Sequence, residues 1–197
     1  MLVAGVDEVG RGALFGPVAA AAVVLPVAAI PQLATLGVKD SKQLSAKRRR
    51  ELMPQIQELA IACAVGWASA SEIDALNILQ ASLLAMKRAV SQLGVAPSLC
   101  LVDGRQVIPD LEMPQQAIVG GDRSSPAIAA ASIIAKVWRD ELITRLALEY
   151  PQYDLANNMG YGTQRHRAAL QQYGPSPLHR LSFAPCRQSG FMINTNS

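Results

Sequence analysis

The chain has 197 residues, half of them hydrophobic, so it can bury one sizeable core, and its length argues against a second independent domain. Its three cysteines form no C-x-x-C pair, which argues against a disulfide framework or a structural zinc site and indicates a reducing cytosol. The net charge of +3 is too small to identify a class of partner by itself.

The first predicted element is a strand over residues 2–8, an apolar run that ends in two acids. Residues 12–38 carry no charge, a length that suggests a transmembrane helix. Glycine, proline and glutamine interrupt this stretch at Gly12, Gly16, Pro17, Pro26, Pro31 and Gln32. Lipid cannot satisfy an interrupted backbone, which argues against a membrane span. Residues 17–25 form a short apolar run and are expected to be a second strand. The acidic start also lacks the basic segment of a signal peptide, and we expect a cytoplasmic protein without a membrane partner.

Ser45 is expected to cap a helix that extends to about residue 61, with a kink at Pro54. Residues 62–69 are compatible with a third strand. Ser71 is then expected to begin one long helix, because apolar residues recur at alternating spacings of three and four as far as Gly94.

Two further apolar runs predict strands, and each is followed by an acid. Leu99–Val102 ends at Asp103, and residues 116–119 end near Asp122.

The remaining chain predicts two helices. Ser125 and Pro126 supply a cap and a first-turn proline for an alanine-rich helix that is expected to reach Tyr150. Residues 163–173 predict a last helix, stopped by a glycine and a proline.

Strands that alternate with helices indicate an α/β fold, and the three strands expected early favour a mixed sheet over a purely parallel one. We interpret residues 1–197 as a single domain, in which residues 1–150 form the α/β core and residues 151–197 a basic helical C-terminal part.

Charge is distributed unevenly along the chain. Residues 1–154 hold 14 Lys and Arg against 15 Asp and Glu, whereas residues 155–197 hold four Arg, both His and no acid. Such a basic end is typical either of a polyanion-binding surface or of a solvated face, and charge alone does not separate the two.

Three carboxylates share one kind of position in the predicted fold. Asp7, Asp103 and Asp122 each lie where an apolar strand gives way to a turn. In open α/β sheets, ligands bind where strands end in loops, so these acids are expected to converge. Convergent carboxylates repel each other, and a divalent cation relieves the repulsion. Oxygen ligands without His or Cys favour Mg²⁺ or Mn²⁺, and two such ions about 4 Å apart can promote phosphodiester cleavage.

Glu8 raises a geometric difficulty, because adjacent strand residues point to opposite faces. We therefore expect the strand to end or twist at Glu8 if Asp7 and Glu8 serve one site. Each acid also has a simpler interpretation. Asp103 with Gly104 is a common turn, Asp122 precedes a helix start, and the first two acids suit a solvated edge.

The sequence resembles a known family in several motifs that follow one another in the family's order. They are GVDEVGRGALFGPV, DSKQLSAKRR, DALNILQAS, LVDGR, GGDRSSPAIAAASIIAKVWRD, GYGT and HRLSF, over residues 4 to about 185. Together they resemble bacterial ribonuclease HII, the type 2 ribonuclease H.

The resemblance implies a ribonuclease H-like fold, a five-stranded mixed sheet flanked by helices with a small helical C-terminal part. It also implies metal-dependent cleavage of RNA in RNA–DNA hybrids and of duplex DNA at single embedded ribonucleotides. The cut is implied to lie 5′ of the ribonucleotide, to leave a 3′-hydroxyl and a 5′-phosphate, and to start ribonucleotide removal from DNA. Oligomerisation is not implied, and we expect a monomer.

The family's active-site acids correspond to Asp7, Glu8, Asp103 and Asp122, as catalytic residues and ligands of Mg²⁺ or Mn²⁺. The following list gives the positions that correspond to substrate contacts: Gly10, Arg11, Gly12, Lys42, Asn77 and Tyr161. The glycines match a turn that reads the sugar at the junction, where a 2′-hydroxyl distinguishes RNA from DNA. The tyrosine matches a residue that packs against the neighbouring sugar.

Simpler readings of these contact residues stay open: an ordinary turn, a solvated lysine, a helix-surface amide, and a loop or core tyrosine. The run Lys47–Arg50 suits a solvated helix face, and His179 with Arg180 suits a structural or phosphate-facing role. The chain departs from the family's usual residues at Ala13 and Gly120, neither of which is a predicted ligand.

Two other functions share this fold. A non-catalytic nucleic-acid-binding module is disfavoured because all four acids are present. A junction resolvase would leave the GRG and GYGT motifs unexplained.

Overall fold

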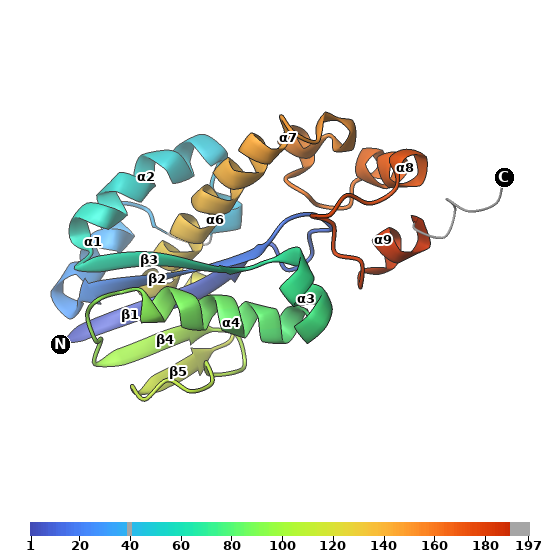
Figure 1. Cartoon of the computed structure of the whole chain (residues 1–197). Helices are drawn as coiled ribbons and strands as arrows, with labels where there is room; N and C mark the ends of the chain where they lie inside the picture. Colours follow the sequence, from blue (N-terminus) through green and yellow to red (C-terminus); the bar gives the residue numbers. More distant parts are fainter. Residues whose placement is uncertain (39–40, 190–197) are drawn as a thin grey trace, which may run out of the picture.

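The computed structural model describes residues 1–38 and 41–189, and its centre is a five-stranded sheet in the order β3-β2-β1-β4-β5 (Figure 1). The strands are β1 (Leu2–Val9), β2 (Val18–Pro26), β3 (Ala62–Ala68), β4 (Leu99–Asp103) and β5 (Gln115–Ile118). β1, β2 and β3 pair antiparallel, whereas β1, β4 and β5 pair parallel. The predicted mixed sheet is confirmed.

Helices cover both faces of the sheet (Figure 1). The α-helices are α1 (Ile30–Thr35), α2 (Ala46–Leu59), α3 (Ala70–Leu76), α4 (Ile78–Ser91), α5 (Gly121–Ser124), α6 (Pro126–Leu146), α7 (Leu155–Asn158), α8 (Gln164–Tyr173) and α9 (Ala184–Ser189). Short 3₁₀ turns lie at Val27–Ala29, Ser41–Gln43 and Pro151–Tyr153. None of the helices in these described ranges is long and apolar enough to cross a membrane.

The centre of the charge-free stretch, β2, is buried on both faces of the sheet. Every residue of β2 before Pro26 is buried, because α4 packs on one face of the sheet and α6 on the other. Small residues allow these helices to approach closely. A Cβ atom on Gly5 would overlap the backbone of Ala127 in α6, and one on Gly66 would overlap the backbone of Ala85 in α4.

Two of the predicted helix caps are confirmed. The Ser45 side chain accepts a hydrogen bond from the backbone N–H of Arg48, and Ser125 accepts one from Ile128. Pro54 lies inside α2, as expected. The helix that begins at Pro126 ends at Leu146, however, one turn before the predicted end.

The single helix predicted from Ser71 is wrong, because the structure has two helices that meet at Asn77. Ser69, rather than Ser71, caps the first of them through a capping box with Glu72. Asn77 has a φ of 76°, and its side chain accepts hydrogen bonds from the N–H groups of Leu79 and Gln80 at 3.0 and 3.1 Å. Apolar spacing continues across this break, so periodicity did not reveal it.

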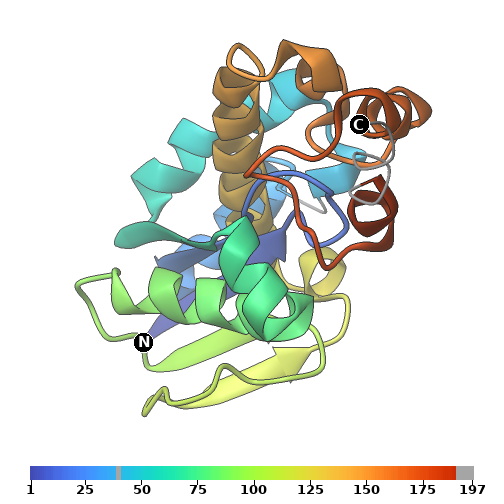
Figure 2. The same cartoon turned by 45° about the vertical axis from the view of Figure 1, so that its right-hand side comes forward.

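The C-terminal segment packs against the loop between β1 and β2 (Figure 2). Leu14 and Phe15 of that loop share a core with Tyr153 and Leu170. Nearby, the Nε2 atoms of two buried histidines, His166 and His179, lie 3.0 Å apart. The last part of the chain is therefore fixed to the loop that follows the two N-terminal acids.

Candidate active site

Asp7 and Glu8 lie at the end of β1, beyond the point where its neighbour β4 stops pairing. The parallel ladder with β4 ends at the pair Val6–Val102, whereas pairing with β2 continues to Val9. The strand therefore does not end at Glu8, which was one of the two expected ways of bringing Asp7 and Glu8 to one site. One side of β1 is open at these residues, and carboxylates on opposite faces of the strand can both reach the space beyond β4.

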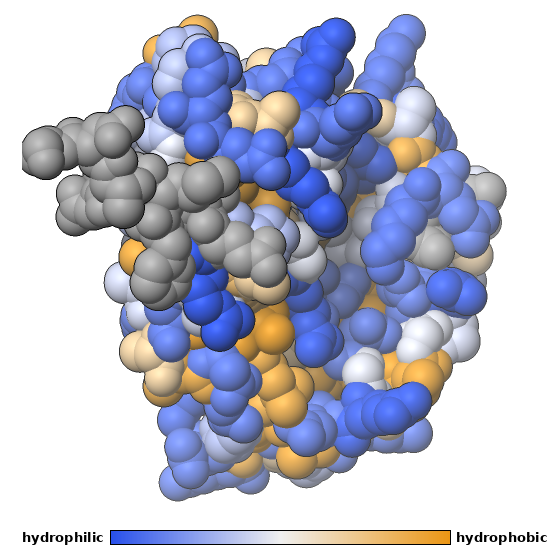
Figure 3. Space-filling model, turned by 90° about the vertical axis from the view of Figure 1, so that its right-hand side faces the viewer, coloured by the Kyte–Doolittle hydropathy of each residue, from blue (hydrophilic) through white to orange (hydrophobic). Residues whose placement is uncertain are grey.

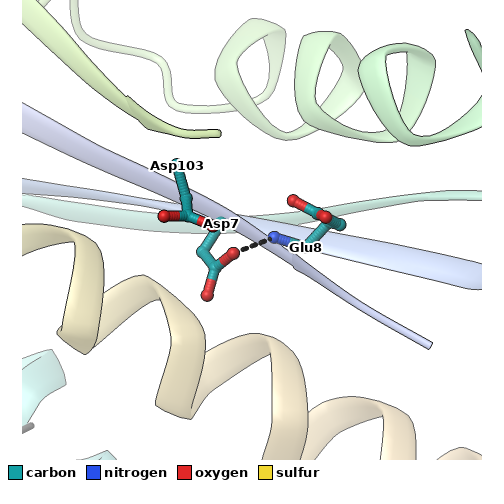
Figure 4. A group of neighbouring side chains, drawn as sticks. All are labelled: Asp7, Glu8 and Asp103. Atoms are coloured by element: carbon teal, nitrogen blue, oxygen red, sulfur yellow. Dashed lines mark hydrogen bonds between the residues drawn. The ribbon is translucent and has the colours of Figure 1, made fainter. Parts of the chain in front are cut away.

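The carboxylates of Asp7, Glu8 and Asp103 meet in that space (Figure 4). One oxygen from each residue lies within 4.8 Å of the other two. Asp7 accepts a hydrogen bond of 2.7 Å from the backbone N–H of Glu8, which turns its carboxylate along the strand. The predicted convergence of acids from distant segments is present for these three residues.

Asp103 is aimed at β1 by the segment that follows β5. The N–H of Gly121 donates a hydrogen bond of 2.7 Å to its Oδ1 atom, and the backbone of Asp122 contributes another. These bonds favour the charged carboxylate and restrict its rotation.

Asp122 lies beside this group without joining it. Its side chain is buried in the first turn of α5, and its Oδ2 atom is 3.5 Å from the Nζ atom of Lys42. The carboxylate of Asp122 contributes to the raised pKa of Asp103, so the two interact electrostatically.

The three convergent acids resist ionisation. Burial, followed by repulsion from Glu8, raises the pKa of Asp7 well above its ordinary value, although the Ser132 side chain opposes this through a hydrogen bond. Burial also raises the pKa values of Glu8 and Asp103, and Arg11 opposes the shift at Glu8. A divalent cation among these oxygens would offset the repulsion, and a donor set of carboxylates alone fits a hard, oxygen-seeking ion. The residues therefore fit a metal centre.

The turn Gly10-Arg11-Gly12 follows the acids, and the buried side chain of Arg139 packs against it. Gly10 has a φ of 88°, and a Cβ atom there would overlap the guanidinium group of Arg139. Around Gly12 the corresponding space is open. Arg11 is exposed, and its Nη1 atom lies 3.2 Å from Glu8 Oε1.

Two fully buried arginines support this turn and the loop after it. Arg139 donates hydrogen bonds to the carbonyl groups of Phe15, Pro17 and Met159 at 2.9–3.0 Å. Arg180 donates to the carbonyl groups of Gly16 and Arg11 at 3.0 and 2.8 Å. Sequence reasoning missed Arg139 and left Arg180 between two interpretations. Its burial makes the structural one correct.

A cavity of 230 Å³ brings five of the six predicted contact residues next to one of the acids, Glu8. It is lined by Glu8, Val9, Gly10, Arg11, Gly12, Ser41, Lys42, Ser132, Lys136 and Tyr161. Tyr161 is half-buried and forms a β-bridge with Ala13, one of the two departures from the family pattern. The other departure, Gly120, has a φ of 65°, which glycine adopts without strain.

Asn77 is the one predicted contact residue that does not line this cavity. It is exposed at the break between α3 and α4, where its side-chain oxygen serves as the helix cap described above.

The sequence analysis missed three other residues of the cavity. Ser41 and Ser132 lie with their Oγ atoms 2.8 Å apart, and Ser132 also hydrogen-bonds Asp7. Lys136 pairs with Asp140 at 2.7 Å and lies 5.8 Å from the centre of the Tyr161 ring. A signal existed for Ser132, since it is a lone hydroxyl in an otherwise apolar stretch of helix.

The five-stranded mixed sheet, with acids on β1 and β4, belongs to the class of ribonuclease H-like nucleases, as alignment with solved structures shows. The structure aligns with the crystal structure of ribonuclease H2 from Pyrococcus horikoshii OT3 at a TM-score of 0.86 and 29% identity, covering 100% of both chains. It also aligns with ribonuclease HII of Archaeoglobus fulgidus, solved as a complex with PCNA, at a TM-score of 0.74 and 31% identity, covering 88% of each chain.

Sequence comparison identifies the family. The model of the family described as Ribonuclease HII matches residues 4–186. The Ribonuclease HII of Acaryochloris marina is 63% identical over 187 residues, which are 95% of this chain and 94% of that protein. The chain belongs to the ribonuclease HII family and is a ribonuclease H, an endonuclease of a family that depends on divalent metal ions and acts on RNA–DNA hybrids.

We predict that Asp7→Asn makes the metal-free protein more stable. In EDTA at pH 8, its free energy of unfolding should exceed that of the wild type by roughly 1 kcal/mol, or about 2–4 °C in Tm, because a buried repelled charge is replaced by a group of equal size. The raised pKa means that the folded wild type binds more protons than the unfolded chain. The advantage of the variant should therefore shrink as the pH falls towards 4.

Thermal unfolding of both proteins, with EDTA and with Mg²⁺, measures this effect. Mg²⁺ should stabilise the wild type more than the variant. A variant that unfolds at a lower temperature than the wild type in EDTA at pH 8 would contradict the electrostatic account.

Proposed function

We propose that this chain cuts duplex DNA on the 5′ side of single embedded ribonucleotides, as well as the RNA of RNA–DNA hybrids, and leaves a 3′-hydroxyl and a 5′-phosphate. One observation carries the proposal: Glu8 belongs both to the group of convergent acids and to the lining of the cavity that contains Gly10–Gly12 and Tyr161. A site that cuts a backbone is then in contact with a site that can recognise a sugar.

Asp7, Glu8 and Asp103 are the proposed metal ligands, together with Asp122, and Mg²⁺ and Mn²⁺ both suit their oxygen atoms. When bound, such ions activate the attacking water and stabilise the leaving oxygen of a phosphodiester. The negative charges of the carboxylates would bind these positively charged ions. The amide groups that bind Asp103 and the hydroxyl of Ser132 on Asp7 keep the ligands in place before substrate arrives.

Recognition of the ribonucleotide is assigned to the turn and the tyrosine. Open space above Gly12 lets a nucleic-acid strand approach the backbone, whose polar groups can bond to a 2′-hydroxyl. The ring of Tyr161 offers an apolar face to the next sugar, where a deoxyribose fits better than a ribose. Lys42 is exposed at the rim of the same cavity, in a position suited to a phosphate group.

This activity would start the removal of ribonucleotides from DNA. We assign it to a cytoplasmic monomer, in which the C-terminal part after residue 150 supports the recognition loop. The hydrogen bonds of Arg180 to the carbonyl groups of Gly16 and Arg11 support this role of the C-terminal part.

A duplex with one ribonucleotide tests the proposed function. The wild type should cut it in Mg²⁺ or Mn²⁺ at the 5′ side of the ribonucleotide, should leave an all-DNA duplex intact, and should be inactive in EDTA. Mapping of the product ends decides the position of the cut. Equal cleavage of the all-DNA duplex would contradict recognition of the ribonucleotide.

The two glycines of the turn provide a matched pair of variants. Gly10→Ala should reduce both stability and cleavage, because its new Cβ atom overlaps Arg139 at a positive φ. Gly12→Ala should leave the stability within about 0.5 kcal/mol of the wild type, since the space around it is open, yet reduce cleavage about tenfold or more by blocking the strand.

Urea unfolding and cleavage of the single-ribonucleotide duplex measure the two effects separately. If Gly12→Ala cleaves this duplex as fast as the wild type, the strand does not approach the turn in the proposed way.

A further inference from the structure

A second cavity lies on the other side of the acids, and none of the roles assigned above uses it. It has a volume of 430 Å³, a size suited to a small ligand or a nucleotide, and it shares Glu8 and Arg11 with the first cavity. Asp103 also lines it. Glu8 therefore lies between the two cavities, and Asp103 lies at the edge of the second one.

The second cavity combines an apolar side with a positively charged side. Leu79, Leu83 and Met86 of α4 and Val119 after β5 form the apolar side. Two of these residues are well exposed, Leu79 by 37% and Val119 by 71%. Figure 3 shows apolar surface at this end of the molecule, in its lower half, surrounded by hydrophilic residues.

Arg11 and Arg105 form the charged side of the cavity, and Arg105 has not been given a role above. It follows Gly104, directly after the strand that carries Asp103, and its side chain is exposed. Within residues 1–38 and 41–189 it forms no ion pair, whereas Arg11 is paired with Glu8. An unpaired guanidinium beside a metal site that binds a phosphodiester favours an anionic occupant, and a nucleic-acid phosphate is the anion already present in the reaction.

The positions of the two cavities on either side of Glu8 indicate in which direction the cleaved strand would run. If the ribonucleotide and the sugar after it occupy the cavity of Gly10–Gly12 and Tyr161, the phosphate to be cut lies over the acids. The strand then continues across Glu8 and Asp103 into the second cavity, on the 5′ side of the cut.

We propose that the second cavity binds the cleaved strand upstream of the cut, with Arg105 on an upstream phosphate and with Leu79 and Val119 against the sugars. This inference rests on the proposed function, and it adds a subsite that would hold the end of the product carrying the 3′-hydroxyl. The complementary strand is the competing occupant, and the experiment distinguishes the two.

The experiment combines neutral phosphates with variants of the protein. A methylphosphonate replaces each phosphate in turn, upstream of the ribonucleotide, downstream of it, or in the complementary strand. Wild type, Arg105→Ala and Arg145→Ala are compared by kcat/KM with Mg²⁺ and by the Kd of each intact duplex in EDTA. Arg145 is an exposed arginine that lines a different hollow, between α2 and α6, and serves as the matched control.

One upstream methylphosphonate should lower kcat/KM and raise the Kd of the wild type about tenfold, the effect expected for one charge-assisted hydrogen bond. Arg105→Ala should show a similar loss on the unmodified duplex and less than about twofold further loss with that methylphosphonate. Arg145→Ala should keep the full tenfold effect of the methylphosphonate.

Coupling of Arg105 to a downstream phosphate or to the complementary strand would overturn the upstream assignment, and coupling to no phosphate would overturn the subsite. Either result, with normal cleavage of the unmodified duplex by the wild type, leaves the proposed function standing. Failure of the wild type to cut that duplex would remove both proposals.

Discussion

The main constraint on this structure is the repulsion among three carboxylates that the fold brings together, because the surrounding residues must balance it. Asp7 and Glu8 come from β1 and Asp103 from β4, and their oxygens approach within 4.8 Å although burial opposes their ionisation. Bringing like charges together in a partly buried site lowers stability, so the surroundings must hold them there. The amide groups at the start of α5, Ser132 of α6 and Arg11 of the turn after β1 do so.

The same principle extends to the loop that follows the acids. This loop would bring a glycine turn to within reach of a nucleic acid, and it is fixed by Arg139 and Arg180, whose guanidinium groups bind backbone carbonyls deep inside the protein. Burial lowers the pKa of Arg180 to about 9, and the nearby charge of Arg139 adds to this effect. Two positive charges, those of Arg139 and Arg180, are therefore buried under the turn. Three negatively charged groups, Asp7, Glu8 and Asp103, meet beside it. Burial of like charges opposes their ionisation at both places, and hydrogen bonds with neighbouring groups hold them there.

Much of the fold followed from local patterns in the sequence. All five strands matched apolar runs, and the caps at Ser45 and Ser125 were visible because side-chain oxygens at helix starts have a local cause. The break at Asn77 was not visible. Its positive φ interrupts the backbone while the apolar spacing of the two helices continues unchanged.

The candidate site was predictable to a similar degree. The convergence of Asp7 with Asp103 followed from the rule that strand ends meet, and Glu8 joined them because β4 stops pairing one residue before Asp7. The role of Arg139 depends on contacts with Phe15 and Pro17, more than a hundred residues away in the chain. An arginine in a helix suggests a solvated side chain, and only tertiary structure shows it buried. The roles of the contact residues stay predictions.

Titration of the EDTA-treated protein with Mn²⁺, followed by the electron paramagnetic resonance signal of the free ion, tests the metal centre most directly. The wild type should bind Mn²⁺, and Asp103→Asn should weaken this binding by about tenfold or more. Asp110→Asn, which changes an exposed acid paired with Lys87, should bind like the wild type. Equal Mn²⁺ affinity in the wild type and Asp103→Asn would contradict the metal centre on which this account rests.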